Sequence, residues 1–211
     1  DLHSFPTRRS SDLEITTAEA CPKPTNLAET NITTNSATLS WEGYNDSYLL
    51  QYRPWFEVGE DTQATGEFVT YTYDLSEFSG MGSIAIRHYD VTDMFYLNID
   101  DVLLTDANGN TLFSEDFESG TIPSTWTNYD VDGDGYVWDL ANSSNMSVNG
   151  NYGVYSASWL SGVGALTPDN WLIISNVEMG GTFSFAAIGQ DPSYPAENFA
   201  ISRSEERFSR D

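Results

Sequence analysis

Residues 83–89 read Ser-Ile-Ala-Ile-Arg-His-Tyr, and residues 94–99 read Met-Phe-Tyr-Leu-Asn-Ile. In both stretches large apolar side chains recur at every second position. Successive side chains of a strand point to opposite faces of a sheet, so this alternation predicts antiparallel strands with one buried face. No stretch of the chain shows the period of 3.6 residues that would favour a helix.

The same alternation continues on both sides of these two stretches. Further predicted strands are residues 37–41, 48–52, 68–73, 111–113, 153–158, 171–174 and 182–186. The dipeptides at 108–109, 132–133, 134–135, 149–150 and 180–181 combine Asn, Asp or Gly with Gly and predict turns. Short strands separated by such turns predict an all-β fold, a jelly roll or another β-sandwich.

The charge balance argues against two kinds of partner. The chain has 32 acidic residues against 8 basic ones, and its net charge is −24. Nucleic-acid binding requires basic patches, and an anionic membrane would repel this chain, so neither partner is expected. High acidity also suits divalent cations. An aromatic content of 14% argues against disorder, which is the alternative reading of such acidity.

Residues that could support nucleophilic catalysis are scarce. Cys21 is the single cysteine, so it cannot form an internal disulfide, and no acid–base partner for a reactive thiol is visible. One of the two histidines, His3, lies in the unusual N-terminal stretch described next. The other, His88, falls in the strand pattern, which favours a structural role over a catalytic one.

The two ends differ from the rest of the chain. The DNA word CGC TCT TCC GAT CTN encodes residues 9–13, and its reverse complement encodes residues 203–207. This word is that of a common sequencing-library adapter. We therefore interpret residues 1–13 and 203–211 as adapter-derived, with a natural basic arm and charged tail as the alternative. The genuine protein then spans about residues 14–202, and both of its own ends lie beyond it.

Residues 22–54 resemble the first three strands of a fibronectin type III domain. Trp41 matches the buried tryptophan of the second strand, and Tyr52 matches the aromatic residue of the third. The later strands of that domain, including its tyrosine corner, do not follow. We therefore predict a linker and a partial fibronectin type III-like β-segment over residues 14–54.

A second resemblance covers residues 67–201. The motifs that carry it are residues 68–75, 85–89, 92–102, 113–120, 130–138, 166–173 and 189–198, together with Pro123 and Trp126. In this region the chain resembles the cleaved adhesin domain, the repeated module in the haemagglutinin/adhesin regions of gingipains. The resemblance implies a jelly-roll fold and an adhesive function.

The order of the two halves of this module departs from the family. The part that resembles the closing half, residues 55–105, precedes the part that resembles the opening half, residues 106–202. The chain therefore reads as the junction between tandem modules, with the second module truncated. A jelly roll could still be completed by permutation, if the strands of 67–105 close the sheet that 111–201 leaves open.

Two groups of acids are candidate calcium ligands. Asp130, Asp132 and Asp134 alternate and precede Gly135, as oxygen ligands do in the first half of a calcium loop. An EF-hand is not expected, because its twelfth position is Ala141 instead of glutamate. An aspartate–glycine turn without metal is the alternative.

The second group depends partly on the resemblance. Asp116 and Glu118 flank Phe117, and strand spacing would place both carboxylates on one face with Phe117 in the core. Modules of this family commonly hold calcium with an acid of the opening strand and acids of the closing strand. The resemblance thus implies Asp100 and Asp101 as partners. The alternative is that these residues are simply exposed acids that bind no metal.

Five aromatic residues are candidates for ligand binding, because exposed aromatic faces stack on sugars and anchor protein interfaces. They are Tyr136, Trp138, Tyr152, Trp159 and Tyr194. A weaker candidate is a loop site between Asp191 and Glu197. Paired acids could also serve a glycosidase, but sequence alone shows no cleft. The cysteine protease of gingipains is a separate domain that this chain does not resemble.

Taken together, the sequence predicts a non-catalytic, calcium-stabilised adhesin module, extracellular or on a bacterial cell surface. Its expected partner is a host surface glycoprotein, a matrix protein or a glycan, without direct membrane insertion. One alternative is a carbohydrate-binding module appended to a secreted hydrolase or protease. The other is a structural spacer domain.

Overall fold

The computed structural model divides the chain into two units, Asp1–Gln51 and Tyr52–Asp211. It describes residues 25–31, 38–43 and 55–205. Over these residues the chain forms strands, turns and bends without a helix, which confirms the all-β prediction. None of the described residues belongs to a helix that could span a membrane.

The described part of the first unit is a two-stranded hairpin. Strand β1 (Thr25–Thr30) pairs antiparallel with β2 (Thr38–Glu42). The side-chain amide of Asn26 donates a hydrogen bond of 2.8 Å to Glu42. Strand β2 falls where residues 37–41 were predicted to be extended. The predicted strand at 48–52, Cys21, and residues 1–13 and 206–211 lie outside the described residues, so the fibronectin-like and adapter interpretations stay predictions.

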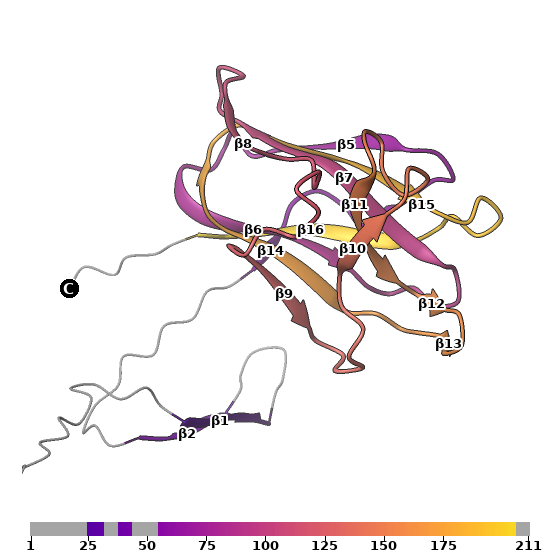
Figure 1. Ribbon diagram of the computed structural model, residues 1–211. Coiled ribbons are helices and arrows are strands. Elements are labelled where there is room, and N and C mark those ends of the chain that lie inside the picture. The colour runs from indigo at the N-terminus through magenta and orange to yellow at the C-terminus, as the bar shows by residue number, and fades with distance from the viewer. Residues whose placement is uncertain (1–24, 32–37, 44–54, 206–211) are drawn as a thin grey trace, which may run out of the picture. The chain divides into compact units, whose positions relative to one another are not determined.

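The second unit contains two six-stranded sheets (Figure 1). The first, the β6 sheet, has the order β3-β16-β6-β14-β9, and β4 also pairs with β16. Its strands are β3 (Phe56–Glu57), β4 (Thr62–Gln63), β6 (Gly80–His88), β9 (Trp126–Asp130), β14 (Asn170–Met179) and β16 (Asn198–Glu205). All of these pairings are antiparallel.

The second sheet, the β7 sheet, has the order β10-β11-β7-β15-β5, and β8 also pairs with β7. Its strands are β5 (Val69–Asp74), β7 (Tyr96–Thr105), β8 (Thr111–Glu115), β10 (Asp139–Asn142), β11 (Tyr152–Ala157) and β15 (Thr182–Gly189). A short hairpin of β12 (Trp159–Leu160) and β13 (Gly164–Ala165) lies outside both sheets.

The hydrophobic core lies between the two sheets. Alternate residues of each strand point inward, such as Ile84 and Ile86 of β6 and Phe183 and Phe185 of β15. The ring of Phe185 meets the ring of Phe199 from the opposite sheet at a centroid distance of 5.7 Å. Each fully buried side chain of this size stabilises the fold by about 1.5–3 kcal/mol. The predicted β-sandwich is therefore confirmed.

Strands from the two predicted halves alternate within each sheet. In the β7 sheet, β15 lies between β5 and β7, and in the β6 sheet, β6 lies between β14 and β16. Residues 55–105 and 106–205 thus complete one sandwich together, as the permuted closure requires. Strand β16 continues past residue 202, where the adapter-derived tail was predicted to begin, and Arg203 packs over the ring of Phe78 at 3.4 Å from its centroid.

Candidate functional site

Strand β7 changes its hydrogen-bonding partner at Asp100 and Asp101. Along one edge it pairs with β11 up to Ile99 and with β8 from Val102 onward. Asp101 lies between these ladders with a φ of 50°. Between the two ladders the side chains of Asp100 and Asp101 contact the loop after β10.

The carboxylate of Asp100 is fully buried beneath this loop. It accepts hydrogen bonds from the backbone N–H groups of Asp101, Val148 and Asn149, at 2.7, 2.8 and 3.3 Å. Burial raises the pKa of Asp100, and the backbone hydrogen bonds counteract part of that rise. Asp101 accepts a bond of 2.6 Å from the side-chain amide of Asn149.

Glu118 also contacts the same loop. Its Oε1 accepts hydrogen bonds from the backbone N–H groups of Asn151 at 2.9 Å and Tyr152 at 2.8 Å. Asp100, Asp101 and Glu118 therefore each contact the loop of residues 148–152 through its backbone or side-chain donors. Among the described residues they do not belong to the group of acids whose oxygens lie within 4.8 Å of one another, so the calcium site predicted for them stays a prediction.

The strand geometry predicted for Asp116 and Glu118 is wrong. Strand β8 ends at Glu115, and Phe117 has a φ of 55°, which is a turn conformation. The backbone N–H of Phe117 is held by the Glu115 carboxylate at 2.7 Å, which stabilises this turn. Phe117 is nevertheless buried in the core as predicted. Asp116 stays exposed, and its Oδ1 accepts the N–H of Glu118 at 3.2 Å.

The loop after β9 holds the tightest group of carboxylates among the described residues. One ligand oxygen from each of Asp130, Asp132 and Asp134 lies within 4.8 Å of the others. Gly133 and Gly135 have φ values of 74° and 85°, a conformation that favours glycine and folds the loop back. Asp130 accepts the N–H groups of both glycines, at 2.7 and 2.9 Å.

The proximity of these carboxylates shifts the pKa values of Asp130 and Asp132. Burial, a hydrogen bond with Asp130 and the charge of Asp134 raise the pKa of Asp132 to about 6. The hydrogen bond with Asp132 is the main cause that holds the pKa of Asp130 below its ordinary value. Three oxygen donors that repel one another would gain from a hard divalent cation, so the donor set fits calcium.

The five predicted aromatic ligand residues do not form one surface. Trp138 is 1% exposed, and its Nε1 donates to the carbonyl of Asn170 at 3.1 Å, so it is a core residue and not an exposed one as expected. Tyr152 is half-buried and packs against the core. Tyr136 is exposed beside the loop of Asp134. Of the five residues, only Trp159 and Tyr194 line the same pocket.

Trp159 and Tyr194 line a pocket at one end of the sandwich, which we call the end pocket. It is open to solvent and has a volume of about 380 Å³, and its lining residues are Asp93, Met94, Phe95, Trp159, Asp191 and Tyr194. The ring of Phe95 lies 5.8 Å from that of Trp159 and stacks on Tyr96 at 3.9 Å. Tyr194 is 58% exposed. Aromatic faces beside carboxylates are typical of a binding site.

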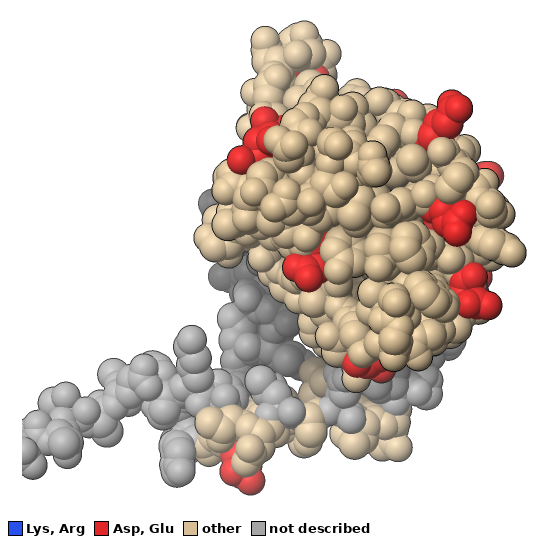
Figure 2. All heavy atoms as spheres, turned by 45° about the vertical axis from the view of Figure 1, so that its right-hand side comes forward, with Lys and Arg blue, Asp and Glu red and all other residues tan. Residues whose placement is uncertain are grey.

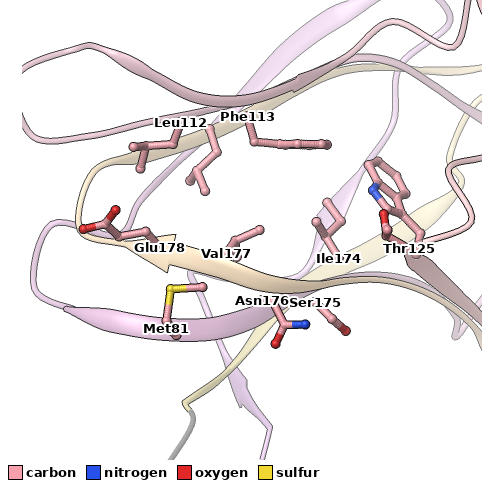
Figure 3. Close-up of a pocket in the computed structure, with 11 residues that line it drawn as sticks. Met81, Leu112, Phe113, Thr125, Ile174, Ser175, Asn176, Val177 and Glu178 are labelled. Carbon is pink, nitrogen blue, oxygen red and sulfur yellow. The ribbon is translucent and has the colours of Figure 1, made fainter.

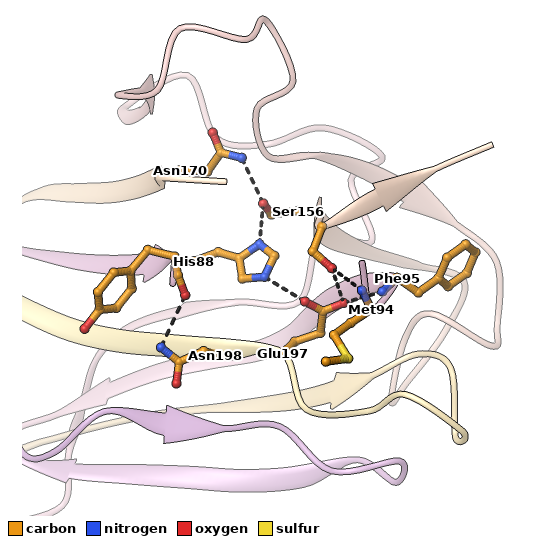
Figure 4. Close-up of polar contacts among 9 residues, drawn as sticks. His88, Met94, Phe95, Ser156, Asn170, Glu197 and Asn198 are labelled. Atoms are coloured by element: carbon orange, nitrogen blue, oxygen red, sulfur yellow. Dashed lines mark hydrogen bonds and ion pairs between the residues drawn. The ribbon is translucent and has the colours of Figure 1, made fainter. Parts of the chain in front are cut away.

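A buried carboxylate holds the walls of the end pocket together. Glu197 is fully buried and accepts hydrogen bonds from the backbone N–H of Phe95 at 2.7 Å and from the hydroxyl of Ser158 at 3.0 Å (Figure 4). Its second oxygen lies 3.0 Å from Nε2 of His88. The sequence had suggested only a weak loop site for Glu197.

The same network connects a serine, a histidine and an acid one after another through hydrogen-bond contacts. Asn170 donates to Ser156 at 3.0 Å, and Ser156 lies 2.8 Å from Nδ1 of His88. The Ser156 hydroxyl accepts from Asn170, so in the tautomer with the proton on Nε2 the hydroxyl donates to Nδ1 of His88 and Nε2 donates to Glu197. Ser156, His88 and Glu197 are each 0% exposed. A nucleophile must reach its substrate, so this arrangement is structural.

A larger cavity of about 490 Å³ lies beside strands β8, β9 and β14. Figure 3 shows Leu112 and Phe113 of β8 on one side and Ile174 and Val177 of β14 on the other. Its lining is mainly apolar. The cavity lies between strands of the two sheets, and Met81 and Leu112 are exposed at its rim. Its lining contains no group of acids or bases that point toward one another, so it does not suggest a catalytic site.

The comparisons with known proteins agree with this architecture. The model of the Cleaved Adhesin Domain family matches residues 34–104 and 110–206. Hemagglutinin A of Porphyromonas gingivalis strain W83 is 35% identical over 153 residues, which is 69% of this chain and 7% of that protein. Gingipain R1 of Porphyromonas gingivalis is 37% identical over 131 residues, 58% of this chain and 8% of that protein.

Lys-gingipain W83 of Porphyromonas gingivalis is 35% identical over 130 residues, 58% of this chain and 7% of that protein. The chain thus spans less than a tenth of the length of these curated relatives. No solved structure matches. Because the family match covers most of the chain in two segments, the chain belongs to the cleaved adhesin domain family.

Proposed function

We propose that this chain is a non-catalytic adhesin module that is secreted or displayed on a bacterial surface and binds a host glycoprotein, matrix protein or glycan. The observation that carries the proposal is the family match over residues 34–104 and 110–206. The name of one relative, Hemagglutinin A, fits an adhesive role. The end pocket, with Tyr194 at its exposed rim, offers a place for a partner to bind.

A binding function suits the described chemistry better than catalysis. The one arrangement that resembles a catalytic triad is sealed in the core, since Ser156 and His88 are both 0% exposed. The end pocket holds two carboxylates next to aromatic rings, which is sufficient for recognition. A carbohydrate-binding module is the second candidate, because the exposed ring of Tyr194 beside Trp159 could stack on a sugar.

Calcium binding is a separate part of the proposal. The loop of Asp130, Asp132 and Asp134 is the first site, and the second comprises the acids Asp100, Asp101, Asp116 and Glu118. Calcium there would neutralise crowded carboxylates and hold the loops rigid. Both loops lie outside the end pocket, so the ion would act on stability and would not contact the bound partner.

The adhesion proposal can be tested with the full chain coupled to fluorescent beads. The beads are incubated with erythrocytes, with epithelial cells and with immobilised matrix proteins, in calcium and in chelator. Beads that carry an equal amount of an unrelated acidic β-sandwich are the control. Adhesion well above the control supports the proposal. Adhesion equal to the control on every surface contradicts it.

A further inference from the structure

The end pocket has an unusual combination of charge and aromatic surface. Its lining contains two carboxylates, Asp93 and Asp191, with the rings of Phe95, Trp159 and Tyr194. Asp93 is exposed, and Oδ1 of Asp191 accepts the backbone N–H of Ser193 at 2.8 Å. The pocket lining includes no basic residue. A ligand that enters therefore meets negative charge and aromatic faces together.

The protein has little positive charge to offset these acids. Among the described residues the basic ones are Arg87 and Arg203. Arg87 pairs with Asp169 through bonds of 2.7 and 2.8 Å, and Arg203 packs over Phe78. Figure 2 turns the side with β12 and β13 toward the viewer and shows scattered Asp and Glu without Lys or Arg. The field of a chain with net charge −24 thus favours a cationic ligand.

The walls of the pocket are held in place before a ligand arrives. Glu197 joins the segment of Phe95 to that of Ser158, as described above. Trp159 also donates its backbone N–H to the carbonyl of Phe95 at 3.2 Å. On the third wall, the N–H of Tyr194 donates to the carbonyl of Asp191 at 3.0 Å. A preorganised pocket loses less entropy when it binds.

We propose that the end pocket binds a lysine or arginine side chain of a partner protein. The cationic head lies against the faces of Trp159 and Tyr194 and between the carboxylates of Asp93 and Asp191. Anionic sugars are excluded by the two carboxylates. A neutral sugar could stack on the same rings, but it gains nothing from the negative field. The inference rests on the proposed adhesin function and names the chemistry of its partner.

The test uses a ten-residue peptide with three lysines spaced by glycine and serine, and its arginine and glutamate counterparts. Binding to the full chain is measured by isothermal titration calorimetry at about physiological ionic strength, where diffuse electrostatic attraction is screened. A neutral hexose oligosaccharide is titrated in parallel. We expect the lysine and arginine peptides to bind, and the glutamate peptide and the sugar not to bind.

Matched variants separate the pocket from the general negative field. Asp93→Asn with Asp191→Asn removes the pocket charges, and asparagine tolerates the φ of 59° at position 93. Glu77→Gln with Asp139→Asn removes two exposed charges elsewhere. The pocket pair should weaken peptide binding at least tenfold, and the control pair less than twofold. Tyr194→Ala should also weaken it, because the exposed ring can be removed without disturbing the core.

Several results would overturn the inference. Equal weakening by both charge pairs would mean that the peptide senses only the overall field. Sugar binding that is lost in Tyr194→Ala, with peptide binding unchanged, would identify a neutral-glycan site. Peptide binding that is unchanged in the pocket variants, with bead adhesion intact, would refute the pocket and leave the adhesin proposal standing. Peptide binding at the pocket without bead adhesion would uphold the inference and refute the adhesin role.

Discussion

Nε2 of His88 lies 3.0 Å from Oε2 of Glu197, although 109 residues separate the two in the chain. His88 ends β6, and Glu197 immediately precedes β16. The pair is sealed from solvent, and the same carboxylate holds Phe95 and Ser158. One side chain thus ties the β6 sheet to the loops that form the end pocket.

Glu197→Ala should therefore destabilise the protein strongly. The substitution leaves the donors of His88, Phe95 and Ser158 buried without an acceptor, at a cost of about 3 kcal/mol or more. Urea unfolding of the full chain measures the free energy of unfolding. Glu77→Ala, an exposed control, should change it by less than about 0.5 kcal/mol. A loss below about 1 kcal/mol in Glu197→Ala would contradict the assigned network.

Gly189→Ala should displace the wall of the end pocket that carries Tyr194. Gly189 ends β15, and a Cβ added there would collide with the backbone carbonyl of Pro195. The loop that carries Tyr194 must then move away, at about 1–3 kcal/mol. We expect a lower midpoint in urea and weaker lysine-peptide binding. Gly109→Ala, at a turn with open space around it, should affect stability alone. Unchanged peptide binding in Gly189→Ala would argue against a rigid pocket wall.

Asp132→Asn should have opposite effects with and without calcium. The raised pKa of Asp132, about 6, means that the folded calcium-free protein binds a proton more tightly than the unfolded chain does. Its contribution to stability is therefore present below the ordinary aspartate pKa and is lost as pH rises through about 6. The variant should raise the melting temperature in chelator at pH 7 and shrink the increase produced by calcium.

Thermal unfolding in excess calcium and in chelator measures both effects of Asp132→Asn. Glu118→Gln is the companion variant for the second acidic cluster. If calcium raises the melting temperature equally in the wild type and in both variants, neither cluster holds the ion. No response of the wild type to calcium would refute the calcium proposal altogether.

Asp169→Asn should weaken the outer face of the β6 sheet. Burial raises the pKa of Asp169, but hydrogen bonds and charge from Arg87 outweigh it, so the pKa lies below its ordinary value. The stability from this pair is present above the ordinary aspartate pKa and is lost as pH falls through the lowered value. We expect a cost of about 1–2 kcal/mol at pH 7.

Urea unfolding at pH 7 and at pH 3 tests the pair of Arg87 and Asp169. The difference between the wild type and Asp169→Asn should be smaller at pH 3, below the ordinary aspartate pKa, because the unfolded wild-type chain takes up a proton at Asp169 there. Asp139→Asn, an exposed change, serves as the control and should be close to neutral at both pH values. A cost that does not depend on pH would mean that packing, and not charge, explains it.

Local alternation predicted most of the fold. The stretches at 68–73, 83–89, 153–158 and 182–186 all lie within or next to observed strands. In 83–89 and 182–186 large side chains enter the core at every second position. The stretch at 94–99 becomes a strand only from Tyr96. There the loop around Asp93, with a φ of 59°, turns to meet Ser158, a partner that no local pattern reveals.

The candidate sites were harder to predict because they depend on distant partners. The acids at 130, 132 and 134 lie close together in sequence and were found as a group. The end pocket was not, since its walls come from three separate segments joined through Glu197. Trp138 follows a run of exposed residues, and only the tertiary structure shows that its indole bonds to Asn170. The long-range network left no local signal beyond the alternation around His88.

The alternation of the two halves within both sheets also constrains how the protein can fold. One edge of β6 pairs with β16, and β16 is synthesised more than a hundred residues later. That edge stays unpaired until then. Until residues near 205 are available, the apolar faces of β5, β6 and β7 have no complete partner. Long sequence separation slows folding and prolongs exposure to aggregation. The complete sandwich can therefore form only after nearly all of residues 55–205 have been synthesised.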